Sequence, residues 1–348
     1  LWPYKTHQSE FLNRIDALFM GANKLTRKDG SLEESFPNEG SYCVTSLVAF
    51  DLLCTIDLIG DQCNALIKKK WIGFVEPMIS FLLKSDESHA IISNHLATAV
   101  AALVRWKKFT DNDKIENKIK KLLKRIIDNQ SVEGWFKEYD GADPGYQSLC
   151  TYYLADVHLQ RPDLDLIKPL RNSIKFLSYF ANPDGSFGGV YGSRCTRFYY
   201  PPGILALSKE IPEAATLSRY MIESVKKKHV ITLSSIDEPN LVPTFNAYCW
   251  ASILYMKTHL QNNIVKSVPS LSNAIFHKHF EDAGLFIDKG VNHYSIIAIG
   301  KGGVTYHFRK KKLLVLNAGI VVKNSKGILG SSQSLNEFFF EKDDCFSC

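Results

Sequence analysis

The chain of 348 residues lacks two features that would place it in a special class at once. No apolar run approaches the length of a membrane span, so we expect no transmembrane segment. Low-complexity stretches are also missing, and an apolar content of 45% is enough for a substantial core. These absences predict a soluble, folded chain of one large domain or two smaller ones.

The eight cysteines do not form a disulfide framework. Half of them stand inside apolar helical runs, where a free thiol behaves as a small hydrophobe: Cys43, Cys54, Cys150 and Cys249. The pair Cys345 and Cys348 stands alone at the chain end, which argues against a zinc or redox site there. We therefore expect no metal and no cofactor, and the unpaired cysteines favour a reducing, cytoplasmic compartment.

The charge pattern is also mild. A net charge of +6 favours an anionic partner, but the lysines are scattered, and we expect no nucleic-acid partner. The basic runs KIKKLLKR and RKKK are typical of solvated faces of helices or strands.

What the chain does contain is a repeated segment in which an acidic-glycine turn leads into an apolar helix. Copies start at Asp29, Glu133 and Asp184, and 13 positions after each start stands an aromatic or basic residue near the beginning of a helix. Those residues are Tyr42, Tyr146 and Arg197. Successive starts are about one hundred and about fifty residues apart. Two further units, which lack the acidic-glycine turn, complete a set of five. Such a period has room for two helices, so each unit predicts a helical hairpin.

The helical segments alternate between two kinds of surface. Residues 42–59 are apolar on nearly every face, which predicts a helix buried all round, whereas residues 113–127 carry a single apolar stripe. This alternation predicts inner and outer helices in two layers. For residues 1–268 we therefore expect an α/α toroid, an incomplete ring of helical hairpins, or the same stack left open as a solenoid.

The pattern changes after about residue 270, where short β-rich runs are separated by glycine turns. Residues 269–348 predict an antiparallel β-sandwich-like domain. Only about five strands fit before the chain ends, fewer than a two-sheet sandwich needs, so we expect this domain to be truncated. Because the chain begins with Leu1 rather than Met, we also expect the natural N-terminus to lie upstream.

If each acidic-glycine turn precedes an inner helix, the turns gather at one end of the ring and their polar side chains share a rim. Pockets between helices, lined by aromatic residues with a few convergent polar groups, are the usual ligand sites. The expected rim comprises Asn38, Glu39, Asn94, His95, Asp140, Asp143, Tyr146, Arg194, Arg197, Tyr199 and Tyr200.

Two stretches resemble parts of heparinase II/III-type and related alginate lyases. SNHLATAVAAL resembles their asparagine-histidine motif, and EGWFKEYDGADPGYQSLCTYYLADV resembles the segment that supplies their catalytic tyrosine. The resemblance implies a polysaccharide lyase that cleaves an acidic, uronate-containing glycan by β-elimination. It also implies that Asn94 pairs with the uronate carboxylate, Tyr146 is the acid or base, and His95 is its partner. Relatives of this kind are often periplasmic or secreted.

The chain departs from that family at two places. Gln147 stands where relatives commonly have histidine, and KGGVTYHF, with His307, stands where their β-domain has a glycine- and histidine-rich motif. Either change predicts a different substrate or a lost activity.

The chemistry of β-elimination explains why these residue types would be needed. Proton removal next to a carboxylate builds up negative charge, which hydrogen-bond donors must stabilise, and the step needs a base and an acid. Arg197 or Arg194 could lower the pKa of a tyrosine and bind an acidic sugar bidentately. The remaining expected substrate contacts are the aromatic surfaces Tyr199, Tyr200, Trp135 and Phe187 and the polar residues Asn38, Glu39, Asp143 and Gln147.

Each candidate also has a purely structural interpretation. Ser93 or Asn94 could cap a helix, and His95 could be a buried structural histidine. Tyr146 and Tyr199 could fill space between helices, and the aspartates of DGADPG suit a turn.

Three other functions stay open. Helical toroids also host glycosidases with paired carboxylates, for which the candidates are Glu138, Asp140, Asp143 and Asp184. The chain could instead bind a glycan without chemistry. The DGSFGG turn also resembles the helix-linking turns of prenyltransferase and terpene-cyclase toroids, but no DDxD-like run is present.

Overall fold

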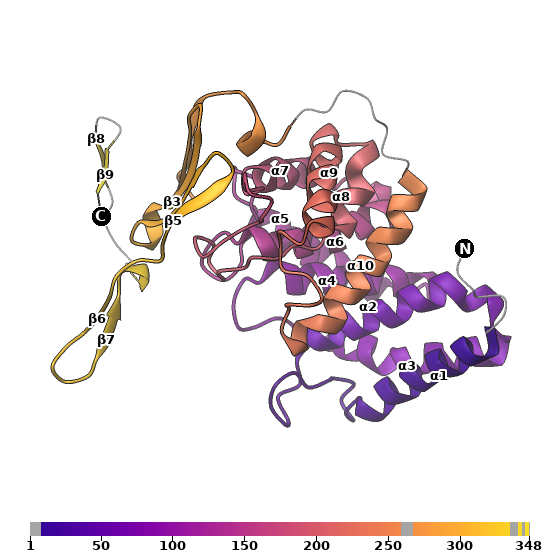
Figure 1. The fold of residues 1–348 in the computed structure, drawn as a ribbon. Coiled ribbons are helices and arrows are strands. Elements are labelled where there is room, and N and C mark those ends of the chain that lie inside the picture. The colour runs from indigo at the N-terminus through magenta and orange to yellow at the C-terminus, as the bar shows by residue number, and fades with distance from the viewer. Residues whose placement is uncertain (1–7, 259–266, 335–339, 343–344, 348) are drawn as a thin grey trace. The chain divides into compact units, whose positions relative to one another are not determined.

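The computed structural model describes residues 8–258, 267–334, 340–342 and 345–347. Within this part, ten α-helices come first and antiparallel strands follow (Figure 1). The chain divides into two compact units. The first unit is Leu1–Asp128 with Leu159–Asp163, and the second is Asn129–His158 with Leu164–Cys348. This division does not follow the expected boundary at residue 268.

The first unit consists of five helices, which are α1 (Gln8–Leu25), α2 (Tyr42–Ile59), α3 (Ala65–Lys84), α4 (Ser93–Trp106) and α5 (Asp113–Asp128). Helix α2 packs against α3 and α4, and α4 packs against α5. Thirteen of the fourteen residues of α4 are buried, so this helix forms the centre of the unit. Helix α5 shows the single apolar stripe that its sequence predicts, with Ile115, Ile119, Leu122, Leu123 and Ile126 buried.

The second unit combines helices with a sheet. Its helices are α6 (Pro144–Gln160), α7 (Ile167–Ser178), α8 (Pro202–Ala206), α9 (Pro212–Lys226) and α10 (Glu238–Thr258). Its main sheet has the order β1-β2-β3-β4-β5, with β1 (Phe276–Phe280), β2 (Leu285–Lys289), β3 (His293–Ala298), β4 (Val304–Arg309) and β5 (Lys312–Asn317). Two hairpins follow, β6 (Val321–Lys323) with β7 (Leu329–Ser331) and β8 (Phe340–Lys342) with β9 (Cys345–Ser347).

The main sheet of the described chain is a single layer and not one half of a sandwich. One face carries Phe280, Ile287, Ile296 and other buried apolar residues, and these pack against residues from the helical part of the same unit. Phe280, for example, meets Phe176 of α7 edge-on, with ring centroids 5.0 Å apart. The apolar face of these strands is thus covered by residues that precede the sheet in the chain.

The three acidic-glycine turns share one conformation. Gly30, Gly134 and Gly185 have φ angles of 91°, 101° and 95°, and each donates its N–H to the carbonyl three residues earlier. A Cβ on Gly30 would lie 2.0 Å from the Pro77 carbonyl oxygen, and one on Gly134 would lie 2.4 Å from that of Asn172. Only glycine tolerates both the positive φ and this close approach. The repeat read from the sequence is therefore a repeat of backbone geometry.

One helical stretch of the described chain, Tyr42–Gln62, is long and apolar enough to cross a membrane by length and composition. The expectation that no run approaches that length was therefore wrong. Half of its 18-residue apolar window is buried, and α2 packs against α3 and α4. A single helix of this kind is weak support for a membrane span. It is not buried all round, because Leu58 is 45% exposed.

Candidate functional site

A buried carboxylate in the first unit holds two imidazoles. The Glu87 side chain is 3% exposed and lies in the loop before α4. Its Oε2 lies 2.7 Å from Nδ1 of His95, and its Oε1 lies 2.9 Å from Nδ1 of His89. The side chain of His95 is 17% exposed and that of His89 is 84% exposed. One imidazole is thus held inside the fold and the other at its surface.

The charge of Glu87 decides how His95 is protonated. Burial alone would raise the pKa of Glu87, but the hydrogen bonds with His95 and His89 and the charge of His95 lower it to about 2. The carboxylate is therefore ionised at neutral pH and can only accept hydrogen bonds. Nδ1 of His95 must carry the proton, which leaves the lone pair of Nε2 available in the neutral imidazole. An imidazole oriented in this way by a carboxylate is suited to act as a general base.

Basic residues of α5 fix the loop that carries Glu87. Lys118 donates from Nζ to the carbonyl of Ser85 at 2.6 Å, and Arg125 donates to the carbonyl of Glu87 at 3.0 Å. Arg125 also pairs with the carboxylate of Asp86 at 3.0 Å. Burial lowers the pKa of Lys118, whose side chain is only 11% exposed. The expectation of a purely solvated lysine face was wrong for these two residues, because they bind the backbone of the neighbouring loop.

A phenol stands near the same carboxylate. Tyr42 opens α2 and is 6% exposed, and its hydroxyl has no hydrogen-bond partner among the described residues. Burial, together with the negative charges of Asp86 and Glu87, raises the pKa of Tyr42 well above its ordinary value. The phenol is therefore protonated at neutral pH and can donate a proton.

Asn94 is the second residue of α4 and is 2% exposed. The capping interpretation is wrong for Ser93 and Asn94, because the N-cap position is Ile92. Asn94 is buried, so it cannot meet a sugar carboxylate directly in this conformation.

In the second unit, an arginine lies between two tyrosine rings. The guanidinium of Arg194 is 4.6 Å from the ring centroid of Tyr139 and 4.9 Å from that of Tyr146. It also pairs with Glu138 at 3.5 Å. The structure thus brings together Tyr146 and Arg194, two of the residues that the sequence assigned to one rim. Asn94 and His95 belong to the other compact unit.

Asp143, expected to bind substrate, is enclosed by backbone amides. It is 0% exposed, and its carboxylate accepts from the N–H groups of Tyr146 at 3.0 Å, Arg194 at 3.0 Å and Thr196 at 3.2 Å. The first of these bonds caps α6, and the other two fasten the loop after Gly192. The turn interpretation of this aspartate is therefore the correct one, and a ligand cannot reach it.

The aromatic residues expected to stack on sugars are buried instead. Trp135 is 7% exposed, Tyr199 1%, Tyr200 3% and Phe187 0%. The hydroxyl of Tyr199 donates to the carbonyl of Met221, and Nε1 of Trp135 donates to Glu133 at 3.0 Å. The expectation was wrong because these rings fill the core, where large apolar surface is most stabilising.

Gln147 is also part of the interior. It is 2% exposed, and its amide donates to Oγ of Ser173 at 2.9 Å and to the carbonyl of Gly134 at 3.3 Å. It ties α6 to α7 and to the glycine turn, so the expected contact with substrate is wrong for this conformation.

The other expected contacts are exposed or serve their own loops. Arg197, Asp140 and Asn38 are exposed. Glu39 is exposed too, but its carboxylate accepts from the N–H groups of Ser35, Glu34 and Phe36, and these bonds lower its pKa. Asp184 accepts from the N–H and hydroxyl of Ser186 within the third glycine turn, at 2.9 Å and 2.6 Å.

Two residues of the first unit's site were not foreseen. Glu87 lies eight positions before His95 in a loop, a spacing that matches no motif, so only coordinates could pair them. Tyr42 carried a signal, because it stands at the same offset from its turn as Tyr146 does.

Among the residues that the structure describes, no group of three or more His, Cys, Asp or Glu side chains is arranged to hold a metal ion. The cysteines with described side chains, from Cys43 to Cys249, are free thiols. The pair Cys345 and Cys348 lies outside the residues whose side chains are described.

No protein-family model matches this chain, and no curated protein matches it. The geometry of the site therefore carries the functional argument.

Proposed function

We propose that this chain is a polysaccharide lyase that cleaves an acidic, uronate-containing glycan by β-elimination, with His95 as the general base. The observation that supports the proposal best is the pair of Glu87 and His95. It combines an ionised, buried carboxylate with a partly exposed imidazole whose outer nitrogen is free to take a proton.

In the proposed reaction, Nε2 of His95 takes the proton from the carbon next to the uronate carboxylate. The electron pair of that C–H bond forms a carbon–carbon double bond, and the glycosidic C–O bond at the neighbouring carbon breaks. The departing oxygen needs a proton. In this proposal water supplies that proton, because the hydroxyl of Tyr42 is buried and cannot reach a substrate in this conformation.

The charges near the site favour an acidic substrate. Lys118, Lys121 and Arg125 of α5 lie 4.0, 3.6 and 3.0 Å from one loop carboxylate, that of Asp86. A cationic surrounding attracts a polyanion and offsets the charge that builds up beside the uronate carboxylate.

We propose further that the helices are the hairpins of an open α/α toroid. The equivalence of the three glycine turns supports this arrangement, since each turn precedes a buried helix and approaches a following helix or its end.

The direct test is incubation of the protein with a panel of uronate-containing polysaccharides, followed by the ultraviolet absorbance of unsaturated uronate ends. We expect absorbance to rise with at least one polysaccharide. Reducing ends without absorbance would instead indicate the glycosidase, and saturable binding without any product would indicate a non-catalytic glycan-binding protein.

Variants of the pair test the assignment of the base. His95→Ala should lower the rate by about 10²–10⁴-fold, the usual contribution of a general base. Glu87→Gln should lower the rate by changing the tautomer of His95. The glutamine N–H can donate to Nδ1, which moves the imidazole proton to Nε2. The equivalent change in serine proteases lowers the rate by a comparable factor. His89→Ala is the matched control, since it removes the other imidazole on the same carboxylate. Loss of activity in that control, or its retention in His95→Ala, would contradict the assignment.

The glycosidase has less support from the described carboxylates. Asp143 is enclosed by amides and Asp184 is engaged in its own turn, so two of the four candidates are occupied by turn geometry. A hydrolase would need Glu138 and Asp140 to act as the pair, and Asp140→Asn would then abolish product formation.

A further inference from the structure

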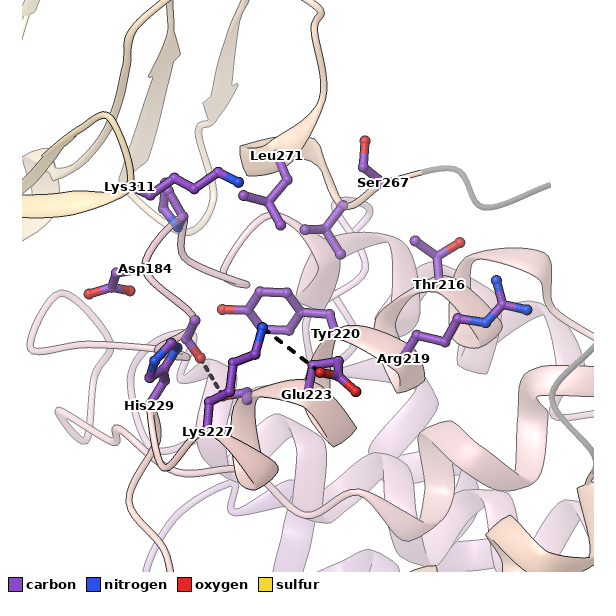
Figure 2. A pocket seen from close by; sticks show the side chains of 14 residues that line it. Asp184, Thr216, Arg219, Tyr220, Glu223, Lys227, His229, Ser267, Leu271 and Lys311 are labelled. Atoms are coloured by element: carbon purple, nitrogen blue, oxygen red, sulfur yellow. Dashed lines mark hydrogen bonds and ion pairs between the residues drawn. The ribbon is translucent and has the colours of Figure 1, made fainter. Parts of the chain in front are cut away.

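A pocket of about 470 Å³ opens in the second unit, and apart from Asp184 and Gly185 its lining residues take no part in the sites described above. Its wall is formed by the third glycine turn, by one face of α9 and by the segment before β1, and Lys311 from the turn after β4 stands at its edge (Figure 2). The volume lies within the range of about 300–1,000 Å³ that small-molecule sites occupy.

The walls of the pocket are held in place by hydrogen bonds from side chains to backbone. The hydroxyl of Tyr220 donates to the carbonyls of Asn182 and Ser186, and that of Ser224 donates to the carbonyl of Gly185. Tyr220 therefore presents a fixed ring in the middle of the pocket (Figure 2), and Val268 and Leu271 add apolar side chains to its lining. A fixed aromatic face is a surface on which a sugar ring can pack without further ordering.

Two cations of the pocket have no carboxylate partner among the described residues. Arg219 is half-buried and Lys311 is exposed, and neither makes an ion pair there. Of the carboxylates that line the pocket, Glu223 pairs with Lys226 at 3.2 Å and Lys227 at 3.9 Å, whereas Asp184 accepts hydrogen bonds from Ser186 and keeps its charge. The lining holds three cations, Arg219, Lys227 and Lys311, and these two carboxylates, so its net charge is +1 with His229 left aside.

The two cations stand on opposite sides of the Tyr220 ring, with Arg219 beside Thr216 and Lys311 on the side of Asp184 (Figure 2). A ligand that meets both cations would therefore carry a negative group on each side of that ring.

We infer that this pocket binds a stretch of acidic oligosaccharide, with one anionic group on Arg219, the next on Lys311 and a sugar ring against Tyr220. The identity of the ligand rests on the proposed function, whereas the demand for two separated anions rests on the pocket alone. Arg219 can accept a carboxylate or a sulfate through two parallel hydrogen bonds, and Lys311 acts as a point charge.

The test is titration calorimetry with a uronate tetrasaccharide, carried out in the full chain with His95→Ala so that the probe is not consumed. Arg219→Gln should weaken binding roughly tenfold, as expected for the loss of one charge-assisted pair. Lys311→Ala should weaken it by a smaller factor, because the lysine is exposed. Lys310→Ala is the matched control, since it removes a neighbouring cation that does not line the pocket, and it should bind as the parent does.

The carboxyl-reduced, neutral tetrasaccharide separates charge recognition from sugar packing, and it should bind much more weakly. Equal binding of the neutral probe, unchanged binding in both Arg219→Gln and Lys311→Ala, or no saturable binding of the acidic probe would overturn the inference. Failure of the proposed function looks different. In that case the wild-type chain yields no unsaturated product from any uronate polymer, while the acidic probe still binds and remains sensitive to Arg219→Gln.

Discussion

Glu87 in the first unit and Asp143 in the second are both buried carboxylates, yet their surroundings differ in kind. Glu87 is met by two imidazoles, and Asp143 by three backbone amides. An amide cannot gain or lose a proton in the physiological range, so the contacts of Asp143 can only hold the chain in place. An imidazole can, so the contacts of Glu87 can take part in chemistry. The comparison teaches that burial of a charge does not by itself indicate function, because the partners decide.

The largest expected effect concerns the amide-bound carboxylate. Asp143→Ala leaves three backbone N–H groups without their acceptor and removes the cap of α6. We expect it to lower the free energy of unfolding by about 3 kcal/mol or more, since each buried unsatisfied group costs about 1–3 kcal/mol. Urea denaturation measures the change.

Asp143→Asn is the matched control, because it keeps one oxygen that can accept part of these bonds and should cost clearly less. If Asp143→Ala were as stable as the wild type, the three amides would not depend on this side chain, and the contrast with Glu87 would disappear.

An intermediate effect concerns the pH dependence of stability. In the folded chain the pKa of Glu87 is about 2, below its ordinary value of 4.5. As the pH falls, the unfolded state therefore protonates Glu87 before the folded state does. The stability that ionised Glu87 contributes is therefore complete above about pH 4.5 and is lost as the pH falls towards about 2. Denaturation at a series of acidic pH values should show a shallower decline for Glu87→Gln than for the wild type.

Asp140→Asn serves as the control for that series, since it removes an exposed carboxylate and should leave the decline unchanged. A wild-type curve identical to that of Glu87→Gln would show that the two imidazoles do not hold this carboxylate in its ionised form.

The smallest expected effect concerns the outer imidazole. His89 is 84% exposed, and exposed ion pairs are worth about 0–1 kcal/mol. His89→Ala should therefore change the free energy of unfolding by less than about 1 kcal/mol. A larger loss in thermal or urea unfolding would mean that both imidazoles, and not only the inner one, are structural partners of Glu87.

Much of the fold could be predicted from the sequence, because it depends on local patterns. The apolar stripe of α5 and the glycine turns follow from spacing and from the conformational freedom of glycine, and both are visible in a single sequence. Strand β1 is less visible in the sequence, because FHKHF has neither clear alternation nor an apolar run and is defined by its pairing with β2. The residues that pack on the apolar face of the sheet were not predicted either, because they lie far from the strands in the sequence and meet them only in the folded chain.

The candidate site was less accessible to sequence reasoning. His95 and Asn94 were singled out by a motif, but the role of His95 comes from Glu87, a loop residue whose position is set by Lys118 and Arg125 of α5. The aromatic residues were misjudged because the sequence does not distinguish a tyrosine or tryptophan that fills a core from one that binds a sugar. Only burial distinguishes them, and burial is a property of the whole fold.

The glycine turns have one more consequence. In two of the three turns, the atom that leaves no room for a side chain is a peptide carbonyl oxygen, of Pro77 or of Asn172. Every residue type carries that oxygen, so the docking helix can exchange its side chains at the contact without loosening it. The turn itself has no such freedom. In proteins that descend from such a chain, the residues of these helices should therefore change long before the three glycines do.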